Sequence, residues 1–311
     1  MSRRVPGSGG RTPGRPASPM EDESQPNARS GPAVSVAIPC YNEEAAIASV
    51  VDEWRRELPG AEIVVFDNNS TDAGSCRAAE RGARVVPVPR QGKGWVVRRI
   101  FDELADRDAV VMIDGDGTYP ASAVGPLLGA VLEGRADMAV GIRRPVSEAG
   151  RPAMSPVRGL GNLLIGSAFH LLVGPGTSDL LSGYRVFSPR AMRTMCLRSE
   201  GFEIETELAG EAVGRGLRVF EAEVPYRPRA AGTSSKLRAL RDGLRILAMI
   251  LRLSLRLRPW RPLLLVSAAL AAVAAGTGDD VAWAAAVIVF LAAVLSAAVV
   301  LARREAIGEV R

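Results

Sequence analysis

Short apolar runs alternate with amphipathic stretches along the first half of the chain. Five runs of four or five residues are rich in Val, Ile and Ala, and turn residues and helix-like segments separate them. The runs cover residues 34–38, 62–66, 84–88, 109–113 and 138–141. Strands that alternate with helices predict an α/β fold, in which a mostly parallel sheet carries helices on both faces.

Polar residues follow three of the predicted strands. Asp67 comes directly after the second strand, Lys93 opens the helix after the third, and Asp114 ends the fourth. Ligands bind such sheets beyond the carboxyl ends of the strands. The three side chains therefore predict a binding site at that edge.

The C-terminal third has a different pattern, in which arginines recur at steps of three, four and seven among leucines and isoleucines. They are Arg238, Arg241, Arg245, Arg252 and Arg256. On a helix they form one stripe, which predicts a basic amphipathic helix at a membrane interface. The solvated face of a core helix is the alternative.

Two apolar segments follow this helix. Residues 281–302 carry no charge, and a bilayer span needs about 20 apolar residues. Residues 262–278 are apolar but shorter. Arginines flank the pair on both outer sides, so the positive-inside rule places both ends in the cytoplasm. The pattern predicts an integral protein of the cytoplasmic membrane, with its main domain facing the cytoplasm.

The net charge of +5 fits either nucleic acid or an anionic membrane surface. The position of the arginines favours membrane lipid, and no nucleic-acid partner is expected. Residues 1–31 are rich in Gly, Pro, Ser and Arg, which predicts a disordered tail and no signal peptide.

The three cysteines, Cys40, Cys76 and Cys196, have no paired spacing. They predict packed thiols rather than a disulfide framework or a zinc site. The single histidine, His170, lies in an apolar run and is also expected to be packed. Catalysis must then rest on carboxylates, basic residues or a metal.

Two carboxylates stand one residue apart in Asp114-Gly115-Asp116, directly after a buried strand. Such a pair can hold Mg²⁺ or Mn²⁺ while substrate phosphates complete the coordination shell. We therefore expect Asp114 and Asp116 to bind a divalent metal that neutralises charge on a diphosphate leaving group.

Several further motifs stand in a familiar order along residues 33–240. They are Pro39-Cys40-Tyr41-Asn42-Glu43, Asp67-Asn68-Asn69-Ser70-Thr71-Asp72, Asp114-Gly115-Asp116-Gly117-Thr118-Tyr119-Pro120, Ser182-Gly183-Tyr184-Arg185, Gly201-Phe202-Glu203-Ile204-Glu205, Val224-Pro225-Tyr226-Arg227-Pro228-Arg229 and Gly232-Thr233-Ser234-Ser235-Lys236. The set resembles family 2 glycosyltransferases of the polyprenyl-phosphate type, which include dolichyl-phosphate mannose synthases and undecaprenyl-phosphate glucosyltransferases. The resemblance implies a GT-A fold.

The resemblance also implies a nucleotide-sugar pocket lined by Pro39, Tyr41, Glu43, Asp67, Lys93, Asp114 and Gly115. Within it, Asp67 would bond the base and Lys93 would approach the nucleotide or its phosphates. Ordinary structural roles stay open for Pro39 and Tyr41, in a strand-ending turn, and for Lys93, in a loop.

An acceptor phosphate is already an anion near neutral pH and needs little general base. It needs cations instead, because two phosphate-bearing substrates repel each other. The candidates are Arg158, Arg229, Ser235 and Lys236. A basic loop attracted to anionic lipid is the alternative. We count Asp116, Asp179, Arg229 and Lys236 as catalytic residues. Three roles stay open for Asp179: orienting the acceptor phosphate, binding the metal and acting as a base. Glu203 is left open.

These observations predict an inverting transfer of a hexose from GDP-mannose or UDP-glucose to polyprenyl phosphate. A transferase for another lipid-linked or polysaccharide acceptor, a nucleotidyltransferase and a non-catalytic membrane scaffold are the alternatives. A Gln-x-x-Arg-Trp motif and a Gly-rich phosphate loop, expected of a processive synthase and a nucleotidyltransferase respectively, are missing from the sequence. A homo-oligomer is left open.

The predicted organisation has five parts. After the tail come a GT-A domain over residues 32–236, an amphipathic helix over 237–260, a two-helix membrane anchor over 261–303 and a cytoplasmic tail over 304–311.

Overall fold

The computed structural model describes residues 31–148, 151–152, 156–229 and 239–308. The predicted tail lies outside these residues apart from Gly31, and so do Ser235 and Lys236. Arg158 lies in a described helix, but its side chain is outside the described part.

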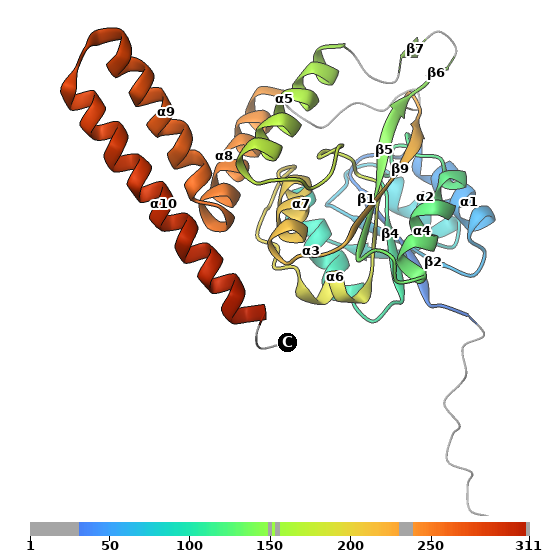
Figure 1. Cartoon of the computed structure of the whole chain (residues 1–311). Helices are drawn as coiled ribbons and strands as arrows, with labels where there is room; N and C mark the ends of the chain where they lie inside the picture. Colours follow the sequence, from blue (N-terminus) through green and yellow to red (C-terminus); the bar gives the residue numbers. More distant parts are fainter. Residues whose placement is uncertain (1–30, 149–150, 153–155, 230–238, 309–311) are drawn as a thin grey trace, which may run out of the picture. The chain divides into compact units, whose positions relative to one another are not determined.

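In the described chain the main sheet has seven strands, in the order β3-β2-β1-β4-β8-β5-β9 (Figure 1). They are β1 (Val34–Cys40), β2 (Glu62–Asp67), β3 (Arg84–Pro87), β4 (Ala109–Met112), β5 (Met138–Pro145), β8 (Arg185–Phe187) and β9 (Val219–Tyr226). Strand β8 runs antiparallel to β4 and β5, and the other neighbouring pairs are parallel. The predicted mostly parallel α/β fold is confirmed.

Helices cover both faces of the sheet, because alternate residues of each buried strand point to opposite sides. Val36 and Ile38 of β1 join the core beneath α1 (Ile47–Glu57), α2 (Gly74–Glu80) and α4 (Val124–Leu132), which follows η1 (Ala121–Ala123). Ala37 joins the opposite core, beneath α3 (Lys93–Leu104), α6 (Pro189–Thr194) and α7 (Ile204–Gly214). Both layers hold the strand ends in place.

The sequence pattern did not predict two strands of the main sheet, β8 and β9. Strand β8 has only three residues, too few to show a period, and it begins at Arg185, the last residue of the Ser182-Gly183-Tyr184-Arg185 motif. Strand β9 alternates apolar residues with exposed Glu221 and Glu223, because it lies at the edge and pairs only with β5 in the described sheet. A small hairpin, β6 (Ser147–Glu148) with β7 (Arg151–Pro152), follows β5.

A third apolar core joins α5 (Pro156–Leu172), α7 and α8 (Ala239–Leu257). Helix α8 buries Ile246, Ile250 and Leu253 in it. Arg256 of α8 also pairs with buried Glu211 of α7. The predicted amphipathic helix therefore exists, and it has a core-facing side in addition to its arginine stripe.

Helices α9 (Trp260–Thr277) and α10 (Asp280–Gly308) form a hairpin. Gly278 closes α9 with a φ of 71°, a left-handed conformation that suits glycine. The Ser267 hydroxyl donates to the Ala286 carbonyl at 2.8 Å across the pair. Both helices are long and apolar enough to cross a membrane, by length and composition.

Two expectations about packed side chains are wrong. Cys40 is buried, but Cys76 and Cys196 are exposed. His170 is exposed as well, because the neighbouring Phe169 takes the core-facing position of α5. The apolar run around His170 belongs to an amphipathic helix, and only one face of that helix is buried.

The packing of strand β8 leads to a prediction about the stability of the protein. Phe187 is fully buried and stacks edge-on against Phe101 with ring centroids 5.1 Å apart. Phe187→Ala should cost about 3–5 kcal/mol and lower the thermal midpoint of the purified protein by about 10 °C. Leu132→Ala, at a 40% exposed residue, is the control. Equal midpoints for the two variants would contradict the packing.

Candidate active site

The carboxyl ends of β1, β2 and β4 bring the predicted residues to one edge of the sheet. Parallel pairing sets Cys40 of β1 beside Asp67 of β2, and Ala37 of β1 beside Met112 of β4. Because the strands end together, the residues that follow them share the edge. This arrangement matches the location that the sequence predicted.

Lys93 and Asp114 meet at this edge. The Lys93 Nζ atom lies 2.6 Å from Asp114 Oδ1 and 2.7 Å from an oxygen of buried Glu205. Burial works to lower the pKa of Lys93, but the two carboxylates outweigh it and raise the pKa. Burial works to raise the pKa of Asp114, and Lys93 together with Arg229 and Arg143 lowers it instead. Both groups are charged.

Asp116 is almost fully buried beside its neighbour Asp114. Burial and the charge of Asp114 raise its pKa above the usual range. Its oxygens are bonded nevertheless, since the Thr118 hydroxyl donates to Oδ1 at 2.6 Å and Arg229 Nη2 lies 2.7 Å from Oδ2. The second arginine nitrogen lies 3.8 Å from Glu43. Arg229 thus joins two of the predicted donor-site carboxylates.

Asp179 holds an arginine that the sequence analysis did not select. Arg143, on β5, donates to Asp179 through Nε at 2.7 Å, Nη2 at 2.6 Å and its backbone N–H at 3.1 Å. The guanidinium also lies 5.5 Å from the centre of the Tyr226 ring. Both Asp179 oxygens therefore face Arg143 in this structure.

Asn68, which follows Asp67, ties two loops of the site together. Its Nδ2 donates to the carbonyls of Val88 and Arg90, and its Oδ1 accepts the backbone N–H of Gly92 at 2.7 Å. This buried amide fixes the loop that carries Lys93. Asp67 accepts the backbone N–H of Ser70 at 3.2 Å and stays partly exposed at the edge.

Gly183 packs against the side chain of Asp114. A Cβ atom at this position would lie 2.4 Å from Asp114 Oδ2, so any larger residue would require the Asp114 carboxylate to shift. The Gly183 backbone N–H donates to the buried Tyr119 hydroxyl at 3.0 Å. The turn before β8 therefore forms one wall of the site.

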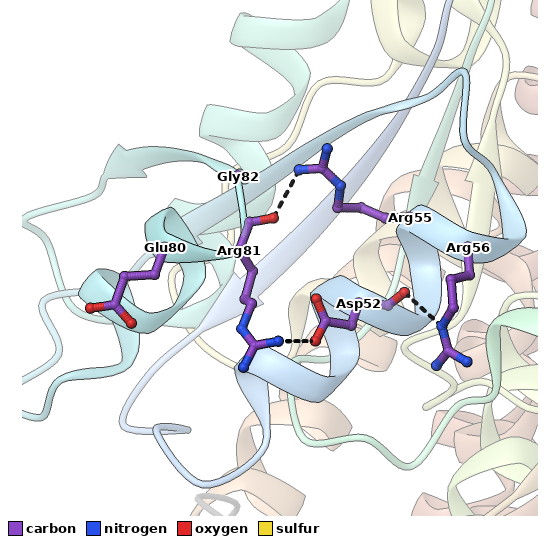
Figure 2. Close-up of a pocket in the computed structure, with 6 residues that line it drawn as sticks. All are labelled: Asp52, Arg55, Arg56, Glu80, Arg81 and Gly82. Carbon is purple, nitrogen blue, oxygen red and sulfur yellow. Dashed lines mark hydrogen bonds and ion pairs between the residues drawn. The ribbon is translucent and has the colours of Figure 1, made fainter.

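A separate hollow of about 680 Å³ lies between α1 and α2 (Figure 2). Its charged residues bond one another: Arg81 binds Asp52 at 2.6 Å, and Arg55 donates to the Arg81 carbonyl at 2.8 Å. None of its lining residues belongs to the cluster around Asp114. We therefore place the chemistry at the strand ends and not in this hollow.

The comparisons with known proteins agree with this geometry. The model of glycosyl transferase family 2 matches residues 35–194. The chain is 37% identical over 211 residues to glycosyltransferase AglJ of Haloferax volcanii, covering 68% of each protein. This chain belongs to glycosyl transferase family 2.

Two further proteins resemble this family 2 glycosyltransferase, one in sequence and one in structure. A dolichyl-phosphate hexose transferase of Haloferax volcanii is 30% identical over 201 residues, which cover 64% of this chain and 85% of the relative. A crystal structure of glucosyl-3-phosphoglycerate synthase from Mycobacterium tuberculosis, in complex with Mn²⁺ and UDP-glucose, has a TM-score of 0.57 and 25% identity. It covers 72% of this chain and 79% of that one. The fold is therefore GT-A-like, in keeping with a glycosyltransferase.

The residues present fit a divalent metal. Asp114 and Asp116 offer carboxylate oxygens, which Mg²⁺ and Mn²⁺ prefer, and both already carry a cationic side chain at 2.6–2.7 Å. Among the described residues, no group of three or more His, Cys, Asp or Glu is arranged so that it could hold a metal ion by itself. The pair would therefore rely on substrate phosphates and water to complete a metal's shell.

The family 2 glycosyltransferase site gathers most of the predicted residues. Glu43, Lys93, Asp114, Asp116 and Arg229 form one linked cluster. Pro39, Tyr41 and Asp67 lie at the ends of β1 and β2. Asp179 stands with Arg143. Sequence reasoning missed Arg143. It quoted Glu205 and Asn68 within two motifs but gave them no role in the site, because a buried ion pair or loop bond leaves no local pattern.

The tight approach of Gly183 tests the site. Gly183→Ala should force Asp114 to move and lower kcat for hexose transfer by about 10²-fold, the cost of a misplaced group. Labelled product formed per unit enzyme measures it. Gly125→Ala on α4, where the added methyl meets open space, should leave kcat unchanged. Equal activity of both variants would contradict the assigned wall.

Proposed function

We propose that this family 2 glycosyltransferase moves a hexose from a nucleotide diphosphate sugar to polyprenyl phosphate, with a divalent metal at Asp114 and Asp116 and with inversion at the anomeric carbon. The observation that carries the proposal is the pairing of partly buried Asp114 and buried Asp116 with cations from separate elements, Lys93 from α3 and Arg229 after β9. Such a site suits a reaction between phosphate-bearing substrates.

The donor side rests on Asp114, Asp116 and Lys93. A metal bound there would offset charge on the departing diphosphate. Lys93 has three N–H donors; it donates one to Asp114 and forms an ion pair with Glu205 at 2.7 Å, and we assign a further N–H to a diphosphate oxygen. Pro39, Tyr41 and Asp67 remain the proposed contacts of the nucleotide. The relative with UDP-glucose supports that donor, and GDP-mannose stays the alternative.

The acceptor side rests on Arg143 and Arg229. The Arg143 guanidinium lies 5.5 Å from the centre of the Tyr226 ring. Burial and Asp116 raise the pKa of the Tyr226 hydroxyl, and the charges of Arg143 and Arg229 partly offset that rise. Two arginines can take a phosphate through paired hydrogen bonds. Arg158, Ser235 and Lys236 remain proposed partners outside the described side chains. We assign Asp179 the task of orienting Arg143, and we no longer assign it the role of base.

The membrane side rests on exposed leucines. Helix α8 exposes Leu244, Leu247, Leu251 and Leu255 at steps of three and four, and α5 exposes Leu160, Leu163, Leu164 and Leu171. Such apolar faces next to an arginine stripe suit the headgroup region of a bilayer. We propose that both helices lie there, with α9 and α10 as the anchor and the active site on the cytoplasmic side.

The chemistry needs few protein groups. An oxygen of the acceptor phosphate attacks the anomeric carbon, the glycosidic C–O bond breaks, and the nucleoside diphosphate leaves with the electron pair. The acceptor is already deprotonated near neutral pH, so the protein orients and neutralises charge, and no base is required. Lys93 and Arg229 are the protein side chains that supply this orientation and neutralise the charge.

A donor and acceptor panel tests the proposal. Membranes that contain the protein should transfer label from one nucleotide sugar to polyprenyl phosphate and give a chloroform-soluble product. Asp116→Asn should lower the rate by at least about 10²-fold, because it removes a charge from the metal pair. Label found only on soluble phosphoglyceric acid, or full activity of Asp116→Asn, would refute the proposal.

Arg143 makes a separate prediction about the acceptor. Arg143→Ala should raise KM for polyprenyl phosphate at least about tenfold, the loss of a charged hydrogen bond, and leave KM for the donor within about twofold. Initial rates at varied acceptor measure it. The neighbour Arg144 is exposed and pairs with Glu223, so Arg144→Ala is the matched control. A selective rise in donor KM would place Arg143 on the other substrate.

A further inference from the structure

Arg185 and Glu205 each end a sequence motif, neither is assigned a substrate contact above, and the structure joins them. Arg185 ends Ser182-Gly183-Tyr184-Arg185, and Glu205 ends Gly201-Phe202-Glu203-Ile204-Glu205. The Arg185 Nε atom lies 3.1 Å from Glu205 Oε2. The same guanidinium donates to the carbonyls of Leu180, Ser182 and Glu205. Arg185 therefore fixes both the turn before β8 and the first turn of α7.

Glu205 stands between two cations. Its side chain is 5% exposed, with Lys93 Nζ at 2.7 Å on one side and Arg185 at 3.1 Å on the other. Lys93 continues to Asp114 at 2.6 Å. Four charges of alternating sign thus run from β8 through α7 and α3 to the proposed metal pair, with Arg185 and Glu205 buried and Lys93 and Asp114 partly buried. A buried carboxylate is costly unless it is paired, and Glu205 is paired twice.

The backbone fixes Lys93 and Glu205 relative to each other. The Gly94 N–H donates to the Glu200 carbonyl at 3.0 Å, and a Cβ atom on Gly94 would lie 2.1 Å from the Ser199 carbonyl oxygen. The loop before α7 therefore packs directly on the start of α3. Glycine on both sides of Lys93 permits this contact, so the distance between ammonium and carboxylate is set by two rigid elements.

The other buried glutamates of α7 have different partners. Glu207 accepts the backbone N–H groups of Arg198 and Ser199 at 2.8–3.1 Å. Glu211 pairs with Arg215 and Arg256. Both are as buried as Glu205, but neither binds Lys93. Glu207 therefore offers a matched control for burial on the same helix.

We infer that Glu205 is a positioning residue of the donor site, which draws Lys93 toward α7. Without this pull, the ammonium group would settle on Asp114 alone and occupy oxygens that the metal needs. With it, Lys93 shares its charge between two carboxylates and keeps one N–H for the diphosphate. The inference rests on the proposed metal pair, and it assigns Glu205 no contact with substrate.

Metal affinity tests the inference without turnover. Mn²⁺ titration of the full-length protein in detergent, followed by the electron paramagnetic resonance signal of free Mn²⁺, gives the dissociation constant. Glu205→Gln should weaken Mn²⁺ binding about 10–100-fold, the usual cost of losing a supporting partner of a metal ligand. Adding Lys93→Met to Glu205→Gln should restore affinity to within about threefold of wild type, because the competing ammonium is gone.

The controls separate positioning from structure. Glu207→Gln should keep the wild-type Mn²⁺ affinity even if its thermal midpoint falls as far as that of Glu205→Gln. If Glu205→Gln does not fold, Glu205→Asp replaces it, since the shorter side chain keeps the charge but moves it away from Lys93. The same loss and the same rescue by Lys93→Met are expected.

The outcomes of the titration test the positioning role of Glu205 separately from the proposed metal pair. Weak binding that Lys93→Met does not restore, or equal losses for Glu205 and Glu207 variants, would overturn the positioning role while leaving the proposed function intact. Absence of Mn²⁺ binding by the wild-type protein, with and without UDP or GDP, would instead remove the proposed metal pair, and with it the ground for this inference.

Discussion

The pairing of Lys93 with two carboxylates is the interaction on which the active site depends. Asp114 is partly buried and Asp116 is buried, and two carboxylates so close together stay ionised only when cations offset their repulsion and desolvation. Lys93 and Arg229 lie 2.6 and 2.7 Å from them and provide that compensation. Because these cations come from α3 and from the chain after β9, the charge balance needs both segments in place beside the end of β4.

Helix α7 links this charge balance to the rest of the molecule. Its buried glutamates are Glu205 and Glu207 in the first turn and Glu211 further along, and they contact Lys93, the loop before the helix and α8 in that order. Gly210 permits close packing, since a Cβ there would lie 2.5 Å from Leu253 of α8. Helix α7 therefore connects the proposed metal site with α8, the helix next to the candidate membrane spans.

Much of the fold was predictable because it depends on local periodicity. The strands that precede Asp67 and Asp114 are continuous apolar runs, and parallel strands place their ends at a shared edge. Strand β8 was not predictable, since three residues carry no period, and β9 was hidden by the charged residues of an edge strand. His170 was misjudged because an apolar neighbourhood does not reveal which face of a helix is buried.

By itself, the sequence determined the α/β class, the family, the candidate spans, and the location of Asp67, Lys93, Asp114 and Asp116. Only the tertiary structure decided which charges neutralise one another: Arg143 with Asp179, Arg229 with Asp116, and Glu205 with Lys93 and Arg185. The physical reason is that secondary structure follows from spacing along a few residues. An ion pair between residues over a hundred positions apart, such as Lys93 and Glu205, follows from burial and sheet order.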